Sequence, residues 1–198
     1  MAVKKKEQIT PEESGYLAGQ LIIATPSLQN SYFSRTVIYV CVHNKDGAMG
    51  IVVNKPVLNF DSRELLKHLD LNIAEDDFQF PIYSGGPVEP GRGFVLHGGD
   101  YENAGTMVVA DGAFGLTSNL EVLEDIASAR GPADSMIALG YVGWSAHQLD
   151  AEILANSWLT VPASKGLVFD ADNSSKWALA NKSAGVDPLM YSEQAGHA

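Results

Sequence analysis

The sequence has little of several features that whole classes of protein require. Its 198 residues contain one cysteine, Cys41, which excludes an internal disulfide and favours a reducing, cytoplasmic location. No apolar stretch reaches the roughly 18–20 residues that cross a bilayer. The lysine-rich start is not followed by the apolar segment of a signal peptide. We therefore expect no membrane association, and we predict a disordered tail over residues 1–14.

Basic residues are also scarce. The chain has 13 Lys and Arg against 24 Asp and Glu, a formal net charge of -11, and Lys4 to Lys6 lie in the predicted tail. Between His68 and Ser164 the only basic residues are Arg92 and Arg130. A protein that binds duplex DNA needs several cations on one surface to neutralise phosphates. We therefore expect no direct binding to nucleic acid.

The residue spacings that mark a metal or cofactor site are missing as well. The five histidines stand apart in the sequence, at His43, His68, His97, His147 and His197. Neither C-x-x-C nor H-x-x-x-H occurs, and there is no phosphate-binding G-x-x-x-x-G-K-[ST] loop. The sequence therefore predicts no metal site and no cofactor.

The most informative stretch is residues 19–56. Residues 36–42, TVIYVCV, are almost all β-branched or aromatic, which is typical of a strand buried on both faces. An Asp-Gly pair at 46–47 suits a tight turn, and AMGIVV at 48–53 forms the return strand. We predict a buried antiparallel hairpin in which Gly50 marks a bulge or the close approach of another backbone.

The rest of the chain alternates short apolar segments with helical patterns. Further strands are expected at 16–24, 80–83, 94–97, 136–142, 158–161 and 167–169, and helices from Asp61, from a capping box at Ser118, at 146–156 and at 172–181. No repeat or linker divides the chain. The sequence therefore predicts one α+β domain over residues 15–198, with a mixed, mostly antiparallel sheet.

Four motifs in order resemble the AlgH/YqgE family of small bacterial proteins. In the hairpin region the matching residues include Gly19, Gln20, Pro26, Phe33, Arg35, His43, Gly47, Ala48, Met49, Gly50 and Asn54. The other motifs are SGGPV at 84–88, RGFVLH at 92–97 and GYVGW at 140–144. The resemblance implies a coiled, branched sheet with helices around it. It also implies a transcriptional regulator, a role that reached the family through an association with transcription.

Two polar patterns suggest catalysis, and each has a structural alternative. Ser145 stands where a nucleophile elbow has its serine, but His147 occupies the position that needs glycine, and Ser145 with Gln148 forms a capping box. Cys41 and His43, two apart on a strand, are predicted to share a face, either as an activated thiol or as a core cysteine beside a histidine. We favour the structural interpretations and assign no catalytic residue. The alternative is a hydrolase or a Cys41-dependent redox enzyme.

A binding role is therefore the favoured hypothesis. Glycines at strand ends let a ligand or another backbone approach closely, and loops on a rigid sheet commonly carry sites. Arg92 would supply charge for an anionic group and Trp144 an apolar wall. The predicted ligand-binding residues are Arg35, His43, Asn54, Gly85, Gly86, Arg92, Gly143 and Trp144. We expect a regulatory or accessory module that binds a protein partner or a small ligand.

Overall fold

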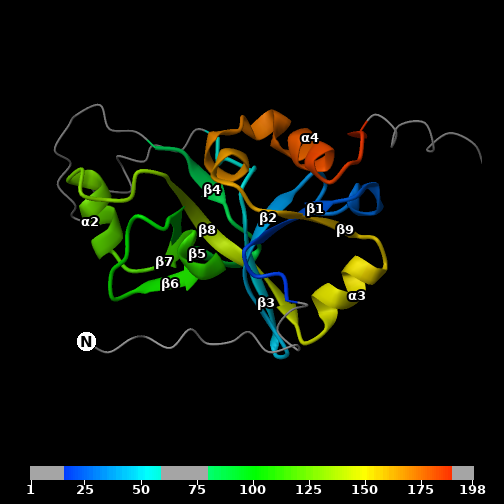
Figure 1. Cartoon of the computed structure of the whole chain (residues 1–198), viewed down its shortest axis with the longest axis horizontal. Coiled ribbons are helices and arrows are strands. Elements are labelled where there is room, and N and C mark those ends of the chain that lie inside the picture. The colour runs from blue at the N-terminus through cyan, green and yellow to red at the C-terminus, as the bar shows by residue number, and fades with distance from the viewer. Residues whose placement is uncertain (1–15, 59–79, 189–198) are drawn as a thin grey trace, which may run out of the picture.

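The computed structural model describes residues 16–58 and 80–188, and within them one branched sheet with helices around it (Figure 1). The strands are β1 (Gln20–Ala24), β2 (Val37–Asn44), β3 (Gly47–Val52), β4 (Ile82–Ser84), β5 (Val88–Gly98), β6 (Thr106–Val109), β7 (Phe114–Thr117), β8 (Ser135–Ser145) and β9 (Trp158–Pro162). The helices are α2 (Glu121–Ala127), α3 (Gln148–Leu154) and α4 (Asn173–Ser183), with short turns η2 (Pro26–Leu28), η3 (Ala110–Gly112) and η4 (Gly166–Asp170). The α+β class predicted from the sequence is confirmed. The helix expected from Asp61 lies outside the described residues.

Strand β8 organises the sheet. The strand order is β6-β7-β5-β8-β3-β2-β1-β9, and β4 branches off by pairing in parallel with β8. β5 runs antiparallel along one edge of β8, while β4 and β3 follow one another along the other edge, at residues 137–139 and 142–145. Figure 1 shows how this long strand joins the two halves of the sheet. The other strand pairs are antiparallel, as predicted.

The central hairpin forms as the sequence predicts. β2 and β3 pair in register from Ile38 opposite Val52 to Asn44 opposite Gly47. The register slips by one residue at Cys41, because Val40 faces Gly50 while Val42 faces Met49. A bulge opposite Gly50 is thus confirmed, and a β-carbon there would lie 2.9 Å from the Tyr39 carbonyl oxygen.

The bulge corrects one prediction about the hairpin. Cys41 and Val42 both pack into one core cluster, whereas His43 pairs with Ala48, which belongs to the cluster on the other face. The extra residue reverses the alternation of side chains along β2. Cys41 and His43 therefore point to opposite faces of the sheet, and the expectation that they share a face is wrong.

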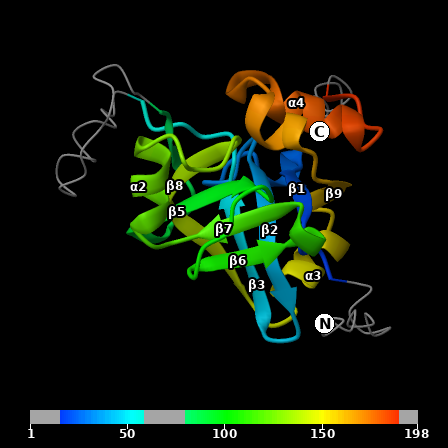
Figure 2. The same ribbon diagram turned by 60° about the vertical axis from the view of Figure 1, so that its left-hand side comes forward.

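Both faces of the hairpin are covered. Tyr39 packs on the face that receives Ala180 of α4, while Ile38 packs on the face that receives Leu149 of α3. Figure 2 shows α4 and α3 on opposite sides of β1 and β2. Residues 21–24 of β1 and 37–41 of β2 are therefore uninterrupted apolar runs, because both of their faces are buried. A third cluster lies under α2 and contains Val122.

Three predictions made from local sequence patterns differ from the observed secondary structure. Residues 167–169, predicted as a strand, lie in the π-helical turn η4, where Ala171 N–H donates to the Gly166 carbonyl. The N-cap residue of helix α2 is Leu120, preceded by Asn119, whose side chain accepts from Val122 N–H, and the predicted capping box at Ser118 does not form. Strand β1 begins at Gln20 and not at residue 16.

No helix within the described ranges is long and apolar enough to cross a membrane.

Candidate functional site

An aromatic cleft of about 400 Å³ opens between β8, α3, the start of β9 and the loop after η2. Its walls include Phe33, Trp144 and Trp158. The Phe33 and Trp158 rings meet edge to face with centroids 5.5 Å apart, and Trp144 and Trp158 do so at 6.2 Å. This arrangement suits the quadrupoles of the rings and fixes each of them in place. The cleft therefore has preformed aromatic walls.

The polar centre of the cleft is the Glu152 carboxylate on α3. Its Oε2 accepts from the indole Nε1–H of Trp144 at 2.9 Å and of Trp158 at 2.7 Å. Its Oε1 accepts from the Gln148 amide at 3.0 Å. Among the described residues no Lys, Arg or His forms an ion pair with Glu152. A partly buried negative charge is thus held by three neutral donors.

The local sequence explains why this carboxylate stands there. Trp144 lies near the end of β8, where it pairs with Ala48, and Trp158 begins β9 opposite Ala24. The short helix α3 connects the two strands, and residues four apart on a helix share a face. Gln148 and Glu152 therefore meet each other and the two indoles. Ser145 N–H donates to the Gln148 side-chain oxygen at 3.0 Å, which is one half of the predicted capping box.

Of the predicted ligand-binding residues, Gly143 and Trp144 line this cleft. The others lie outside its walls. Gly85 and Gly86 follow β4, where a β-carbon would lie 2.3 Å from the Gly140 carbonyl oxygen and 2.1 Å from the Tyr141 carbonyl carbon, respectively. The backbone that approaches these glycines is therefore that of β8 in the protein itself.

Arg92 and His43 make local contacts of their own. Arg92 is exposed on β5, with its guanidinium 3.1 Å from Glu89 Oε2 and 5.1 Å from the centre of the Phe94 ring. His43 is buried, and its Nδ1 accepts from Leu17 N–H at 3.1 Å. Its Nε2 lies 3.5 Å from Asp150 Oδ1 on α3. His43 thus connects the hairpin to the segment before β1 and to α3.

Arg35 and Asn54 meet at the open end of the β2–β3 hairpin. The Asn54 Nδ2 donates to the Arg35 carbonyl, and its Oδ1 accepts from Val37 N–H, each at 2.9 Å. Arg35 has a positive φ of 52° and places its guanidinium 5.3 Å from the centre of the Trp177 ring. Next to Asn54, Lys55 donates to the Tyr32 carbonyl and lies over the Tyr32 ring.

Neither candidate nucleophile is activated. Burial raises the pKa of the Cys41 thiol far above its ordinary range, so the thiolate is not populated near neutral pH. The Ser145 hydroxyl donates to the Gln148 side-chain oxygen at 3.1 Å, and no general base contacts it among the described residues. No group of three or more potential metal ligands gathers within those residues either.

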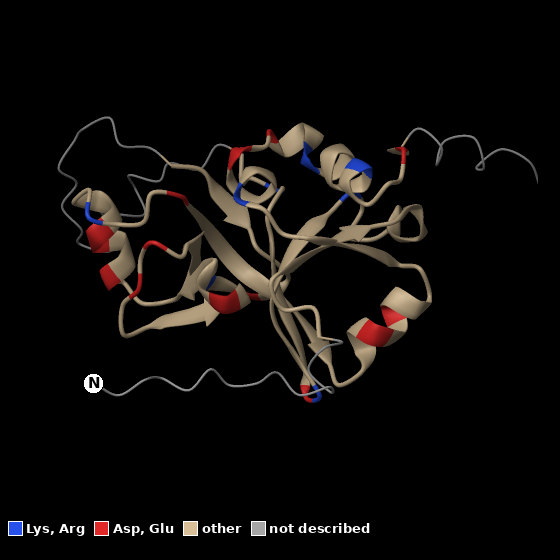
Figure 3. Ribbon diagram, viewed as in Figure 1, with Lys and Arg blue, Asp and Glu red and all other residues tan. Residues whose placement is uncertain are grey.

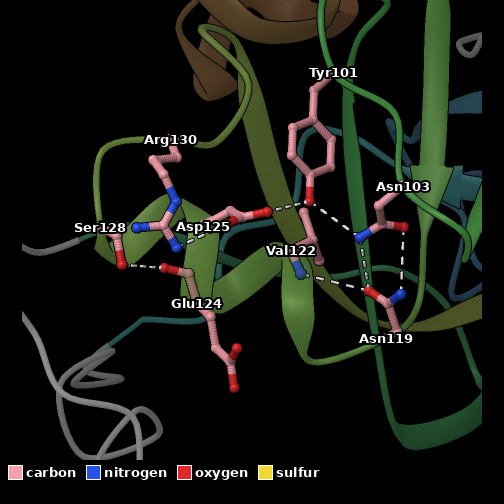
Figure 4. A network of polar contacts seen from close by, with 8 residues as sticks. All are labelled: Tyr101, Asn103, Asn119, Val122, Glu124, Asp125, Ser128 and Arg130. Atoms are coloured by element: carbon pink, nitrogen blue, oxygen red, sulfur yellow. Dashed lines mark hydrogen bonds and ion pairs between the residues drawn. The ribbon is translucent and has the colours of Figure 1, made fainter.

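A second polar network, which the sequence did not indicate, joins α2 to the loop after β5 (Figure 4). The Tyr101 hydroxyl donates to Asp125 at 2.8 Å, and Arg130 forms an ion pair with the same carboxylate at 3.0 Å. Asn103 donates to the Tyr101 oxygen and to Asn119. Burial and the hydrogen bond to Asp125 raise the pKa of Tyr101. The side chains of Tyr101, Asn103, Asn119, Asp125 and Arg130 each have a partner in this network, which therefore anchors α2.

The sequence analysis also did not identify Glu152 as a site residue. The available signal was its spacing, since Trp144, Gln148 and Glu152 follow one another at intervals of four. That spacing predicts one helical face only if the whole segment is helical. Here Trp144 belongs to a strand, so the meeting of these side chains depends on the tertiary structure.

Relatives of known sequence match nearly the whole chain. A UPF0301 protein of Cereibacter sphaeroides is 43% identical over 182 residues, which cover 92% of this chain and 99% of the relative. A UPF0301 protein of Jannaschia is 45% identical over 189 residues, covering 95% and 98%. The similarity therefore covers nearly the full length of both relatives.

Two solved structures resemble the protein. The solution structure of the AlgH protein from Pseudomonas aeruginosa matches with a TM-score of 0.75 and 37% identity, over 97% of this chain and 100% of the other. The crystal structure of protein DIP2367 from Corynebacterium diphtheriae has a TM-score of 0.68 over 89% and 91%, and its 18% identity supports the fold alone. Residues 21–189 match the family model described as AlgH-like, and the chain therefore belongs to the AlgH-like family.

Proposed function

We propose that the protein is a regulatory or accessory module that binds a protein partner. A cationic side chain of the partner enters the aromatic cleft. The observation that carries this proposal is the Glu152 carboxylate, which has three neutral donors and no cation among the described residues. Its Oε1 has a single donor, so one lone-pair site is left for an incoming N–H. A guanidinium or ammonium group complements this charge.

The cleft favours a cation over other ligands. An anion would face the carboxylate directly, and a neutral apolar group would leave the remaining lone pair of Glu152 without a donor. A cation gains a charge-assisted hydrogen bond of about 1.5–3 kcal/mol. Contact with the Phe33 ring adds about 0.5–1 kcal/mol. The net charge of -11 attracts a basic partner as well, and Figure 3 shows that the charged residues coloured on α3 are acidic.

These magnitudes limit what a single side chain achieves. Together they supply about 2–4 kcal/mol, which corresponds to a dissociation constant near or above about 1 mM. A cation in the cleft therefore specifies the partner, and the surrounding surfaces must contribute most of the affinity. This division suits an accessory module whose associations are reversible.

Catalysis receives less support. The thiol of Cys41 is buried and the hydroxyl of Ser145 donates to Gln148, so a redox or hydrolytic reaction has no activated nucleophile among the described residues. A regulatory role exerted through protein contacts also agrees with the low number of cations.

The test is a titration followed by NMR through the indole N–H signals. The three indoles belong to Trp144, Trp158 and Trp177, and the last donates to the Ala24 carbonyl outside the cleft. With N-acetyl-arginine amide as the probe, we expect the Trp144 and Trp158 signals to move and the Trp177 signal to stay. The matched neutral probe is N-acetyl-citrulline amide, which keeps the shape and loses the charge. Equal shifts with both probes, or none up to about 10 mM, would contradict the proposal.

A further inference from the structure

The open end of the β2–β3 hairpin holds two cations that the proposed function does not use. We propose that Arg35 and Lys55 form an anion-binding site there, and that its ligand is a small molecule carrying a phosphate group. This site is separate from the aromatic cleft, because neither residue lines the cleft.

Hydrogen bonds hold three segments together at this end. The Asn54 side chain bonds to the Arg35 carbonyl, and the next residue, Lys55, donates to the Tyr32 carbonyl. The Lys55 carbonyl accepts from Ser84 N–H at 2.9 Å, and the Ser84 hydroxyl lies 2.9 Å from the Tyr32 hydroxyl. The loop after η2, the end of the hairpin and the end of β4 therefore form one small surface with two cations and two hydroxyls.

The cations have unused hydrogen-bonding capacity. Within the described residues, the five N–H groups of the exposed Arg35 guanidinium have no acceptor, and its contact is the face of Trp177. The Lys55 ammonium donates to one carbonyl, which leaves two of its three donors. Neither side chain forms an ion pair with a carboxylate of the described residues. Both cations therefore keep donors for an anion in a chain whose net charge is -11.

The electrostatics and the backbone both point to a ligand. Burial lowers the pKa of Lys55, since no acidic group compensates for its lost hydration. Arg35 adopts a positive φ of 52°, which costs free energy for a residue other than glycine, and the Asn54 hydrogen bond to its carbonyl maintains this conformation. The same hydrogen bond ties the Arg35 backbone to Asn54, the residue next to Lys55, so the two cationic side chains leave the backbone from linked positions.

A phosphate group suits these donors better than a carboxylate does. The forked guanidinium of Arg35 binds two oxygens of one phosphate, the Lys55 ammonium binds a third, and the linked hydroxyls of Tyr32 and Ser84 supply one more donor. A carboxylate has two oxygens and one charge and would leave part of this set unused. The exposure of Arg35 limits the affinity, so we expect dissociation constants near about 1 mM for phosphate alone.

The experiment is a titration of the full chain with inorganic phosphate, followed by NMR, with sodium chloride at matched ionic strength as the reference. We expect the Trp177 indole signal to move, because Arg35 lies over its ring, while Trp144 and Trp158 stay unchanged. Phosphate should also raise the pKa of Lys55, measured from its side-chain carbon shifts. A Trp177 response equal to that in chloride would overturn the proposal.

Variants separate the site from a general charge effect. Lys55→Gln and, independently, Arg35→Gln should each weaken phosphate binding at least about tenfold. The matched control is Lys45→Gln, which removes a cation from the closed end of the same hairpin and should leave the affinity unchanged. An equal loss in all three variants would overturn the proposal, as would no loss in Lys55→Gln. These outcomes are independent of the arginine titration of the cleft, whose reporters are the other two indoles.

Discussion

Replacing Lys176 by methionine should change how the stability of the protein depends on pH. Lys176 is 1% exposed, and its ammonium donates to the Val53 carbonyl at 2.8 Å and the Val168 carbonyl at 2.6 Å. It connects α4 to the hairpin end and to η4. Burial lowers its pKa from 10.5 to about 8, although Asp170 and Asp172 act in the opposite direction. Keeping the Lys176 ammonium protonated inside the protein therefore lowers the free energy of unfolding.

The size and sign of the effect follow from this pKa. A displacement from 10.5 to about 8 corresponds to about 3 kcal/mol. Below pH 8 both the folded and the unfolded chain carry the proton, so the penalty is constant. Between about pH 8 and 10.5 the unfolded chain binds the extra proton, and the unfolding free energy therefore rises with pH. Lys176→Met removes this rise, and it also leaves two carbonyls without their donor.

The assay is urea unfolding of wild type and Lys176→Met at about pH 7 and about pH 10. Burial raises the pKa values of Cys41 and Tyr39, which lowers the stability of both proteins alike at alkaline pH. The quantity to compare is therefore the difference between the two proteins. We expect that difference to grow in favour of wild type by up to about 3 kcal/mol. A difference that does not change with pH would refute the reasoning, because Lys176 would then titrate alike in both states.

Three further predictions concern the core, the β4–β5 turn and DNA. Cys41 should react with a thiol reagent slowly in the native protein and quickly in denaturant, and fast native labelling would favour the redox alternative. Gly86→Ala should lower the unfolding free energy by at least about 2 kcal/mol, because the β-carbon meets the Tyr141 backbone, whereas Gly91→Ala enters open space and should have little effect. In a mobility-shift titration at about 150 mM salt we expect no sequence-dependent retardation of duplex DNA, and submicromolar binding would contradict the charge argument.

The hairpin could be predicted because its signals are local. Seven residues in a row, of which all but Cys41 are β-branched or aromatic, have few alternatives to a doubly buried strand, and an Asp-Gly pair defines the turn. The same reasoning failed at Cys41 and His43, where it used strict alternation. The bulge that reverses their faces occurs at Cys41 itself. Gly50 signalled a bulge, but not which residue of the opposite strand would be the extra one.

Elements fixed by long-range contacts could not be predicted in this way. Residues 167–169 have strand propensity, yet they form a π-helical turn whose Val168 carbonyl accepts from the buried Lys176. The candidate site shows the same limit. Trp144 was found through its motif, whereas Glu152 matters because two indoles from different strands donate to it. That the Glu152 carboxylate has no cationic partner among the described residues can be determined only from the folded structure.

The binding of N-acetyl-arginine amide to wild type, Glu152→Gln and Glu124→Gln tests the central claim most directly. Glu152→Gln removes the charge and keeps one oxygen that accepts from both indoles, so the aromatic walls should stay in place, although its NH2 group replaces the acceptor of the Gln148 amide. Glu124 is an exposed carboxylate on α2, outside the cleft, and its replacement changes the net charge equally. We predict that Glu152→Gln weakens binding at least about tenfold and that Glu124→Gln has no effect. Equal affinities for wild type and Glu152→Gln would contradict the account.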